Sequence, residues 1–97
     1  MLRHVVMIRF REESKTVEVT DKLKKMLLGL CNSIESLLNI EVGINISTKT
    51  SAYDLVLTAD FSDENGLDDY RVHPEHVKVL DYLRIVMEKA AVVDYIN

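Results

Sequence analysis

The spacing of the apolar residues switches between two periods along this chain, and the order of the switches limits what the chain can fold into. In residues 2–10 apolar side chains recur at every second position, which is the period of a β-strand. From Val19 onward they recur every three or four positions, which predicts a helix over residues 16–36. Residues 38–46 and 53–61 alternate again on either side of a polar turn, and they predict a hairpin.

Two further helices and a last strand are expected after the hairpin. Ser62 is a candidate N-cap for the first of these helices. That helix must end before Pro74, because the residue before a proline avoids the helical region, and Pro74 suits the first position of the next helix. Residues 92–96 predict a fourth strand. The order matches the α+β, ferredoxin-like βαββαβ fold with a four-stranded antiparallel sheet.

The two faces of this sheet differ in polarity. One face is uniformly apolar and is expected to pack against the helices; it carries Leu2, Val6, Ile40, Val42, Leu55 and Leu57. The other, called the open face below, mixes apolar and charged side chains; it is expected to carry Val5, Met7, Val56, Thr58 and Val93 with Arg3, Arg9, Asp54, Asp60 and Asp94. Half-apolar faces are usually covered, and twofold dimers are the commonest assemblies. We therefore expect a homodimer that pairs through the open faces.

Length and composition limit the classes of partner. The 97 residues suffice for a single domain, residues 1–97, and the net charge of −4 with scattered basic residues argues against nucleic-acid binding. The one cysteine, Cys31, can form no internal disulfide. The apolar run near the N-terminus is too short for a signal peptide or a membrane span. We expect a cytoplasmic protein with no membrane partner.

Three side chains able to exchange protons or donate hydrogen bonds are expected to meet in the apolar layer. His76 heads the apolar stripe of the last helix, whose later members are Leu80, Leu83 and Met87. His4 lies on the helix-facing side of the first strand, and Tyr70 comes from the shorter helix on the same side. A neutral imidazole near a helix N-terminus can act as a general base, and a phenol can stabilise an oxyanion. We predict His76, Tyr70 and His4 as catalytic residues.

Other types of site have weaker support. His73 lies outside the last helix and is expected to cap it or to face water. Because HPEH differs from the HExxH zinc motif and Pro74 sends the two imidazoles in different directions, we predict no metal and no cofactor. An alternative is a non-catalytic binding or scaffold dimer in which the histidines only cap and pack. A cavity of at least a few hundred Å³ beside His76 would distinguish the two hypotheses.

Five segments of the chain, in order, resemble the stress-responsive α/β-barrel (Dabb) family: LRHVVMIRF, EVGIN, AYDLVLTADF, YRVHPEHVKV and VVDY. The resemblance implies a dimeric α/β barrel in which two ferredoxin-like subunits face each other through their sheets. A plant cyclase of this kind folds a polyketide by aldol condensation without a metal or organic cofactor. Its catalytic histidine, its helix tyrosine and its first-strand histidine match His76, Tyr70 and His4.

The resemblance also implies limits on the chemistry. This chain has Leu55, and about Leu27, where that cyclase has a further histidine and a tyrosine. These departures argue against the same cyclisation but leave the histidine and tyrosine pair intact. The resemblance therefore implies a small hydrophobic, oxygenated ligand and aldol-like or cyclase-like lyase chemistry at His76. Related dimeric barrels include cofactor-free monooxygenases, which gives a second alternative.

Overall fold

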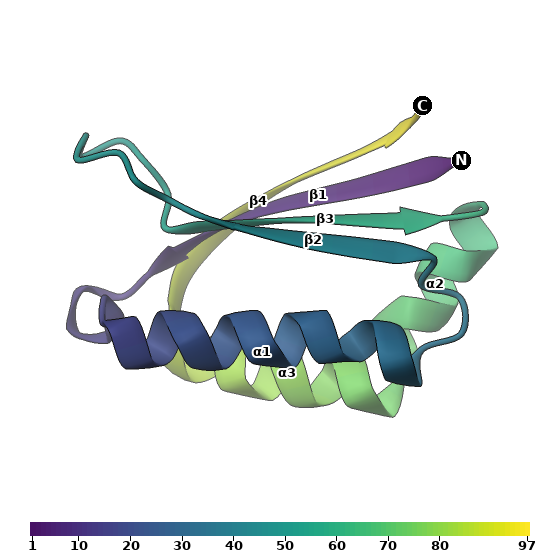
Figure 1. Ribbon diagram of the computed structural model, residues 1–97, viewed down its shortest axis with the longest axis horizontal. Helices are drawn as coiled ribbons and strands as arrows, with labels where there is room; N and C mark the ends of the chain where they lie inside the picture. The colour runs from purple at the N-terminus through teal and green to yellow at the C-terminus, as the bar shows by residue number, and fades with distance from the viewer.

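A four-stranded antiparallel sheet forms one layer of the molecule and the helices form the other, as the computed structural model of residues 1–97 shows (Figure 1). The elements are β1 (Leu2–Phe10), a short 3-10 turn (Glu12–Ser14), α1 (Val17–Ser33), β2 (Asn39–Ile44), β3 (Leu55–Phe61), α2 (Glu64–Val72), α3 (Pro74–Val86) and β4 (Met87–Ile96). The strand order β2-β3-β1-β4 places β1 inside the sheet. The ferredoxin-like fold is confirmed.

The helices begin at polar caps, which confirms one predicted terminus and corrects two others. The Thr16 hydroxyl accepts a hydrogen bond from the Val19 N–H at 3.2 Å, so α1 begins where expected. The same helix ends at Ser33 rather than near Ser36, because the backbone leaves the helical region at the next residue. The cap of α2 is Asp63 rather than Ser62. A carboxylate at a helix N-terminus is favoured both as an acceptor and by the helix dipole.

The fourth strand is longer than the sequence predicts. It begins at Met87 instead of near residue 92, and it pairs with β1 along the whole length of that strand. Met87 was expected to be the last member of the apolar stripe of the last helix, but it is the first residue of β4. The pairing of β1 with β4 shifts register between Arg9 and Phe10, where the chain passes from α3 into β4. The hairpin strands are shorter than predicted, because residues 45–54 leave the sheet as a long loop.

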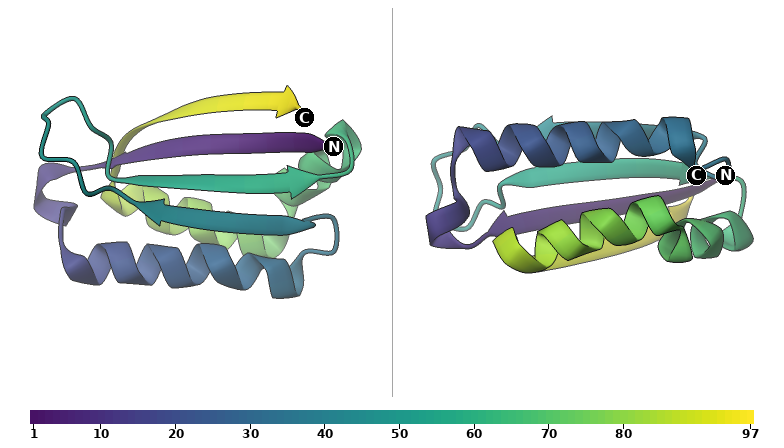
Figure 2. Two further views of the ribbon diagram at one scale, coloured as in Figure 1. Left: turned by 45° about the horizontal axis from the view of Figure 1, so that its top comes forward. Right: turned by 90° about the horizontal axis from the view of Figure 1, so that it is seen from below.

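The core lies between the helices and the helix-facing side of the sheet. Figure 2 shows α1 and α3 side by side beneath the sheet, with α2 beyond the end of α3. The largest fully buried side chains are Phe10, Phe61, Tyr70, Ile8, Leu23, Leu27, Ile34 and Leu55. All the helices lie on one side, so no helix covers the open face of the sheet (Figure 1).

The three strand aspartates do not share the environment that the sequence suggested. Asp60 is buried on the open face and forms an ion pair with Arg3, with a distance of 2.9 Å between Nε and Oδ1. The Asp54 carboxylate accepts a hydrogen bond from the Phe10 N–H at 2.8 Å, so it anchors the end of the hairpin to β1. Asp94 was expected on the open face, but its register opposite His4 places it on the helix-facing side.

Candidate functional site

The three predicted site residues come from three different elements and lie together in the layer between sheet and helices. His4 lies near the start of β1, Tyr70 in the last turns of α2, and His76 in the first turn of α3. The ring centroids of Tyr70 and His76 are 4.2 Å apart, and those of Tyr70 and His4 are 6.2 Å apart. The phenol ring therefore contacts the His76 imidazole and forms an edge-type pair with His4.

The break between α2 and α3 brings these rings together. Pro74 occupies the first position of α3, so the chain turns at His73 and a new helix begins. The Nδ1 atom of His73 accepts a hydrogen bond from the Glu75 N–H at 3.1 Å and so caps the new helix, which is one of the two roles expected for it. This turn points His76 back toward Tyr70 rather than out along α2.

The hydrogen bond of His76 fixes the tautomer of its neutral ring. Its Nδ1 lies 3.1 Å from the backbone oxygen of Arg71, and because a carbonyl can only accept, Nδ1 must donate. The Nε2 atom of the neutral ring therefore carries the lone pair. Burial lowers the pKa of His76, and the weaker effect of the bond to Arg71 in the opposite direction does not cancel it. The imidazole is accordingly neutral near pH 7 and can accept a proton.

His4 belongs to an Asp–His pair that sequence reasoning missed. Its Nδ1 lies 2.5 Å from Oδ1 of Asp94, the residue opposite it on β4. A carboxylate only accepts, so Nδ1 of His4 is the donor in this pair, and Nε2 is the acceptor of the corresponding neutral tautomer. The other carboxylate oxygen of Asp94 lies 3.4 Å from Nη2 of Arg71, whose Nη1 contacts Asp68 at 3.1 Å. An ion-pair chain thus links α2 to the edge strand beside His4.

Tyr70 is the most deeply buried of the three residues. It is 1% exposed and packs edge-on against Phe61, with ring centroids 5.1 Å apart. Burial raises the pKa of the Tyr70 phenol to about 12, so the hydroxyl is protonated at neutral pH. A protonated phenol can donate a hydrogen bond to an oxygen atom of a ligand.

A cavity of about 390 Å³ lies beside these residues. Its lining is mainly apolar and comes from β1, β3, β4 and all three helices, with His4, Tyr70, Arg71 and His76 as the polar members. Leu83 and Met87 line it beyond His76, so apolar walls extend from the polar groups along α3. Val92 on β4 also lines the cavity and is 54% exposed, so the cavity reaches the surface beside the edge strand. This volume falls within the usual range for sites that bind small molecules.

No group of three or more His, Cys, Asp and Glu side chains is placed to share a metal ion. None of the helices combines the length and the apolar character that crossing a membrane requires.

Known proteins resemble this chain in sequence and in fold. Olivetolic acid cyclase from Cannabis sativa is 24% identical over 96 residues, which cover 97% of this chain and 94% of the cyclase. A dimeric protein of unknown function with a ferredoxin-like fold from Bacteroides fragilis is 28% identical, with a TM-score of 0.86 over 97% of this chain and 93% of that one. Hydroxynitrile lyase from Passiflora edulis has the same fold, with a TM-score of 0.85 at 16% identity over 99% of this chain and 93% of the lyase.

The family assignment rests on a match along nearly the whole chain. Residues 2–97 match the sequence profile of the stress responsive A/B barrel domain, Dabb. The match spans every element from β1 to β4, including the α2–α3 break that carries Tyr70 and His76. This chain belongs to the stress responsive A/B barrel (Dabb) family.

Proposed function

We propose that this protein binds a small hydrophobic, oxygenated molecule in the cavity beside α3 and performs cofactor-free acid/base chemistry on it, with His76 as general base. The observation that carries the proposal is the composition of the cavity: apolar walls with a neutral imidazole and a protonated phenol at one end. Apolar pockets with a few convergent polar groups are typical of small-molecule sites. The similarity to olivetolic acid cyclase supports aldol-like or cyclase-like chemistry.

The proposed reaction begins with transfer of a proton from a carbon beside a carbonyl group to Nε2 of His76. The resulting enolate oxygen accepts a hydrogen bond from the Tyr70 hydroxyl, which stabilises the negative charge. The enolate carbon then forms a bond with a second carbonyl carbon, and the oxygen of that carbonyl takes the proton back from His76. The steps balance without an oxidant or a metal, and His76 ends in its starting state.

The Asp94–His4 pair has a positioning role in this proposal. Asp94 fixes the proton on Nδ1 of His4 and so presents Nε2 as an acceptor. A ligand hydroxyl, or an enol form of the ligand, could donate to that atom. The pair would then select oxygenated ligands over plain hydrocarbons of the same size.

We also propose that two copies pair through their open faces. Met7 and Val93 lie on that face and are 42% and 62% exposed, so a partner would remove apolar surface from water. The related protein from Bacteroides fragilis is described as dimeric, which supports the same assembly for this chain.

Proton exchange is the direct test of the base. An alkyl methyl ketone incubated in D₂O exchanges the hydrogens beside its carbonyl when a base removes them, and NMR follows the loss of signal. We expect the wild-type protein to accelerate this exchange and His76→Ala to lose about a hundredfold or more of the acceleration, the usual contribution of a general base. His73→Asn is the matched control, because asparagine also caps helices and residue 73 does not line the cavity.

The same samples separate binding from chemistry. If the ketone shifts the NMR signals of cavity residues but exchanges equally in wild type and His76→Ala, the cavity binds the ligand and the base assignment is wrong. That result would favour the non-catalytic binding dimer. If no ketone or phenol perturbs the cavity residues, the ligand-binding proposal is wrong as well.

A further inference from the structure

The loop between β2 and β3 rises from the sheet on the side away from the helices (Figure 1). Residues 45–54, called the arm below, are fixed at their base. The Asn45 N–H donates to the Asp54 carbonyl at 3.0 Å, and the Arg9 guanidinium donates to the Thr50 carbonyl. The arm is therefore anchored both to its own hairpin and to β1.

Hydrogen bonds within the arm give it a defined shape. The Asn45 side chain accepts from the Ser47 N–H and donates to the Ser47 carbonyl, both at 2.9 Å. The Ser47 hydroxyl accepts from the Lys49 N–H at 3.2 Å, and the Ala52 N–H donates to the Lys49 carbonyl at 3.1 Å. A segment ordered in this way loses little conformational entropy when it binds a partner.

Ile46, the residue after Asn45, is a large apolar side chain in this mainly polar arm. It is 97% exposed, more than any other large hydrophobic residue of the chain. Its neighbours in the arm are held by hydrogen bonds, so the side chain is presented to solvent on a structured support rather than hidden against the sheet.

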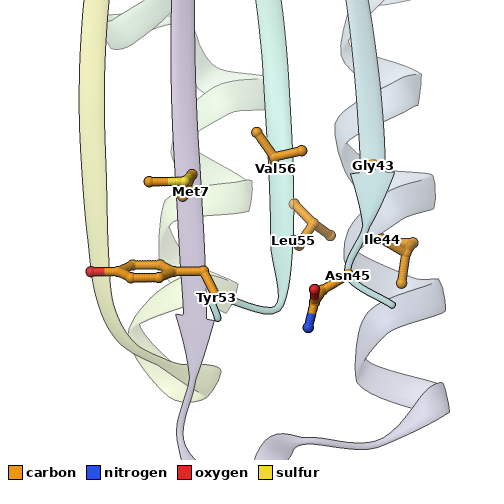
Figure 3. A pocket seen from close by; sticks show the side chains of 7 residues that line it. All are labelled: Met7, Gly43, Ile44, Asn45, Tyr53, Leu55 and Val56. Carbon is orange, nitrogen blue, oxygen red and sulfur yellow. The ribbon is translucent and has the colours of Figure 1, made fainter. Parts of the chain in front are cut away.

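The open face beside the arm contains an apolar hollow of about 270 Å³ (Figure 3). Met7 from β1 and Val56 from β3 line it, and the Tyr53 ring extends over β1 toward β4. Arg9 and Lys89 approach that ring, with the guanidinium carbon and Nζ at 5.8 and 5.7 Å from its centroid. No side chain of the same copy fills this hollow.

We propose that the arm clasps a second copy of this chain, with Ile46 packed against the partner's open face. The inference rests on the open-face dimer proposed above and adds a contact to it. A copy placed over the open face must meet the arm, because the arm rises on that side. A twofold axis makes the contact reciprocal, so each dimer gains two such contacts.

The dissociation constant of the dimer tests the clasp. Burial of one isoleucine side chain is worth about tenfold to a hundredfold in affinity, and the substitution removes both contacts of the dimer, so Ile46→Ser should raise the constant by about a hundredfold or more. The substitution removes no packing within the folded chain, because the Ile46 side chain is 97% exposed. Val17→Ser is the matched control: Val17 is 72% exposed at the start of α1, on the helix layer, and its replacement should leave the constant unchanged.

Paramagnetic labelling locates the contact directly. In a Cys31→Ser background, a nitroxide is attached to Ile46→Cys. This spin-labelled chain, which contains no ¹⁵N, is mixed with ¹⁵N-labelled wild type. We expect broadening of the amide signals of Met7 and Val56 in the labelled partner and none at Val77 and Ile85 on α3. Broadening confined to the helix layer would overturn the clasp.

The outcomes also separate the clasp from the dimer on which it rests. If Met7→Asp gives monomers while Ile46→Ser dimerises like wild type, the open-face dimer stands and the clasp is wrong. If wild type sediments as a monomer at every concentration, both are wrong, whereas the ligand-binding proposal is unaffected.

Discussion

The two histidines of the HPEH segment carry out different tasks because a proline separates their backbones. His73 uses Nδ1 as an acceptor to cap α3, whereas His76 uses Nδ1 as a donor to the Arg71 carbonyl. Opposite roles for Nδ1 leave Nε2 as a donor in neutral His73 and as an acceptor in neutral His76. Of the three histidines, only His4 and His76 line the cavity, so the surroundings rather than the residue type select the candidate base.

Replacing Tyr70 by phenylalanine separates the two roles of that side chain. The ring packs against Phe61 and His76, and phenylalanine preserves these contacts. We expect the free energy of unfolding to change by less than about 1 kcal/mol in urea denaturation, because a hydroxyl contributes little unless a buried partner is left unpaired. Affinity for an oxygenated ligand should fall about fivefold to tenfold in titration calorimetry, the value of one hydrogen bond. Unchanged affinity would remove the hydroxyl from the ligand site.

The lowered pKa of His76 predicts a pH dependence of stability. The ordinary pKa is 6.5, and that of the folded state is lower, so between the two values the unfolded chain binds more protons than the folded one. The contribution of neutral His76 to the free energy of unfolding is fully present above about pH 6.5 and is lost as the pH falls toward the folded-state pKa. Urea denaturation of wild type and His76→Gln from about pH 7.5 to about pH 5.5 should show their difference in unfolding free energy shrink with acidification. A constant difference would mean that burial does not perturb the imidazole.

At the scale of elements, the helices depend on single capping side chains. Thr16 satisfies the free Val19 N–H at the start of α1, the longest helix. Thr16→Ala should lower the free energy of unfolding by about 1 kcal/mol in urea denaturation. Thr48→Ala, in the arm, is the control and should change it by less than about 0.5 kcal/mol. Equal effects of the two substitutions would show that the cap does not stabilise α1.

Hydrophobic periodicity was sufficient to predict the helices and strands, but not which residues of β4 lie opposite which residues of β1. The alternation in β1, β2 and β3 predicted which face meets the helices, because one set of positions in each is apolar, with His4 as the one polar member. In β4, both sets are mixed: Val92 and Ile96 flank Asp94 on one side, and Val93 and Tyr95 lie on the other. Local pattern therefore could not place Asp94, which needed the register with β1.

The same distinction applies to the candidate site. His4, Tyr70 and His76 could be brought together from helical phase and strand alternation, because each lies in an element with one clear apolar face. The Asp94 partner of His4 is determined by cross-strand pairing at a separation of 90 residues. At Gly43 the reason for the residue type also lies on a neighbouring strand, because a Cβ there would lie 3.0 Å from Cγ1 of Val56.

At the scale of the whole molecule, the sheet is covered on one side only. A domain of this size buries about 60–65% of its unfolded surface, so its own core provides modest stability. The open face has exposed Met7 and Val93 but also the Arg3–Asp60 ion pair. A partner that covers the apolar part would add to stability, and the ion pair would favour one alignment of the two sheets over others.

Pairing of this kind makes stability depend on protein concentration. When folding and association are coupled, each tenfold dilution lowers the free energy of unfolding by about 1.4 kcal/mol of dimer. We therefore expect the urea midpoint of wild type to fall with dilution.

Met7→Asp places a charge in the middle of the open face, where removing that charge from water against a second copy would be costly. This variant should therefore elute as a monomer, and its urea midpoint should not depend on concentration. Val77→Asp adds the same charge to the exposed side of α3 and is the matched control, which should keep the wild-type elution volume and dilution effect. An unchanged elution volume for Met7→Asp would mean that the two sheets do not meet, and a dilution effect lost in Val77→Asp alone would move the interface to the helix layer.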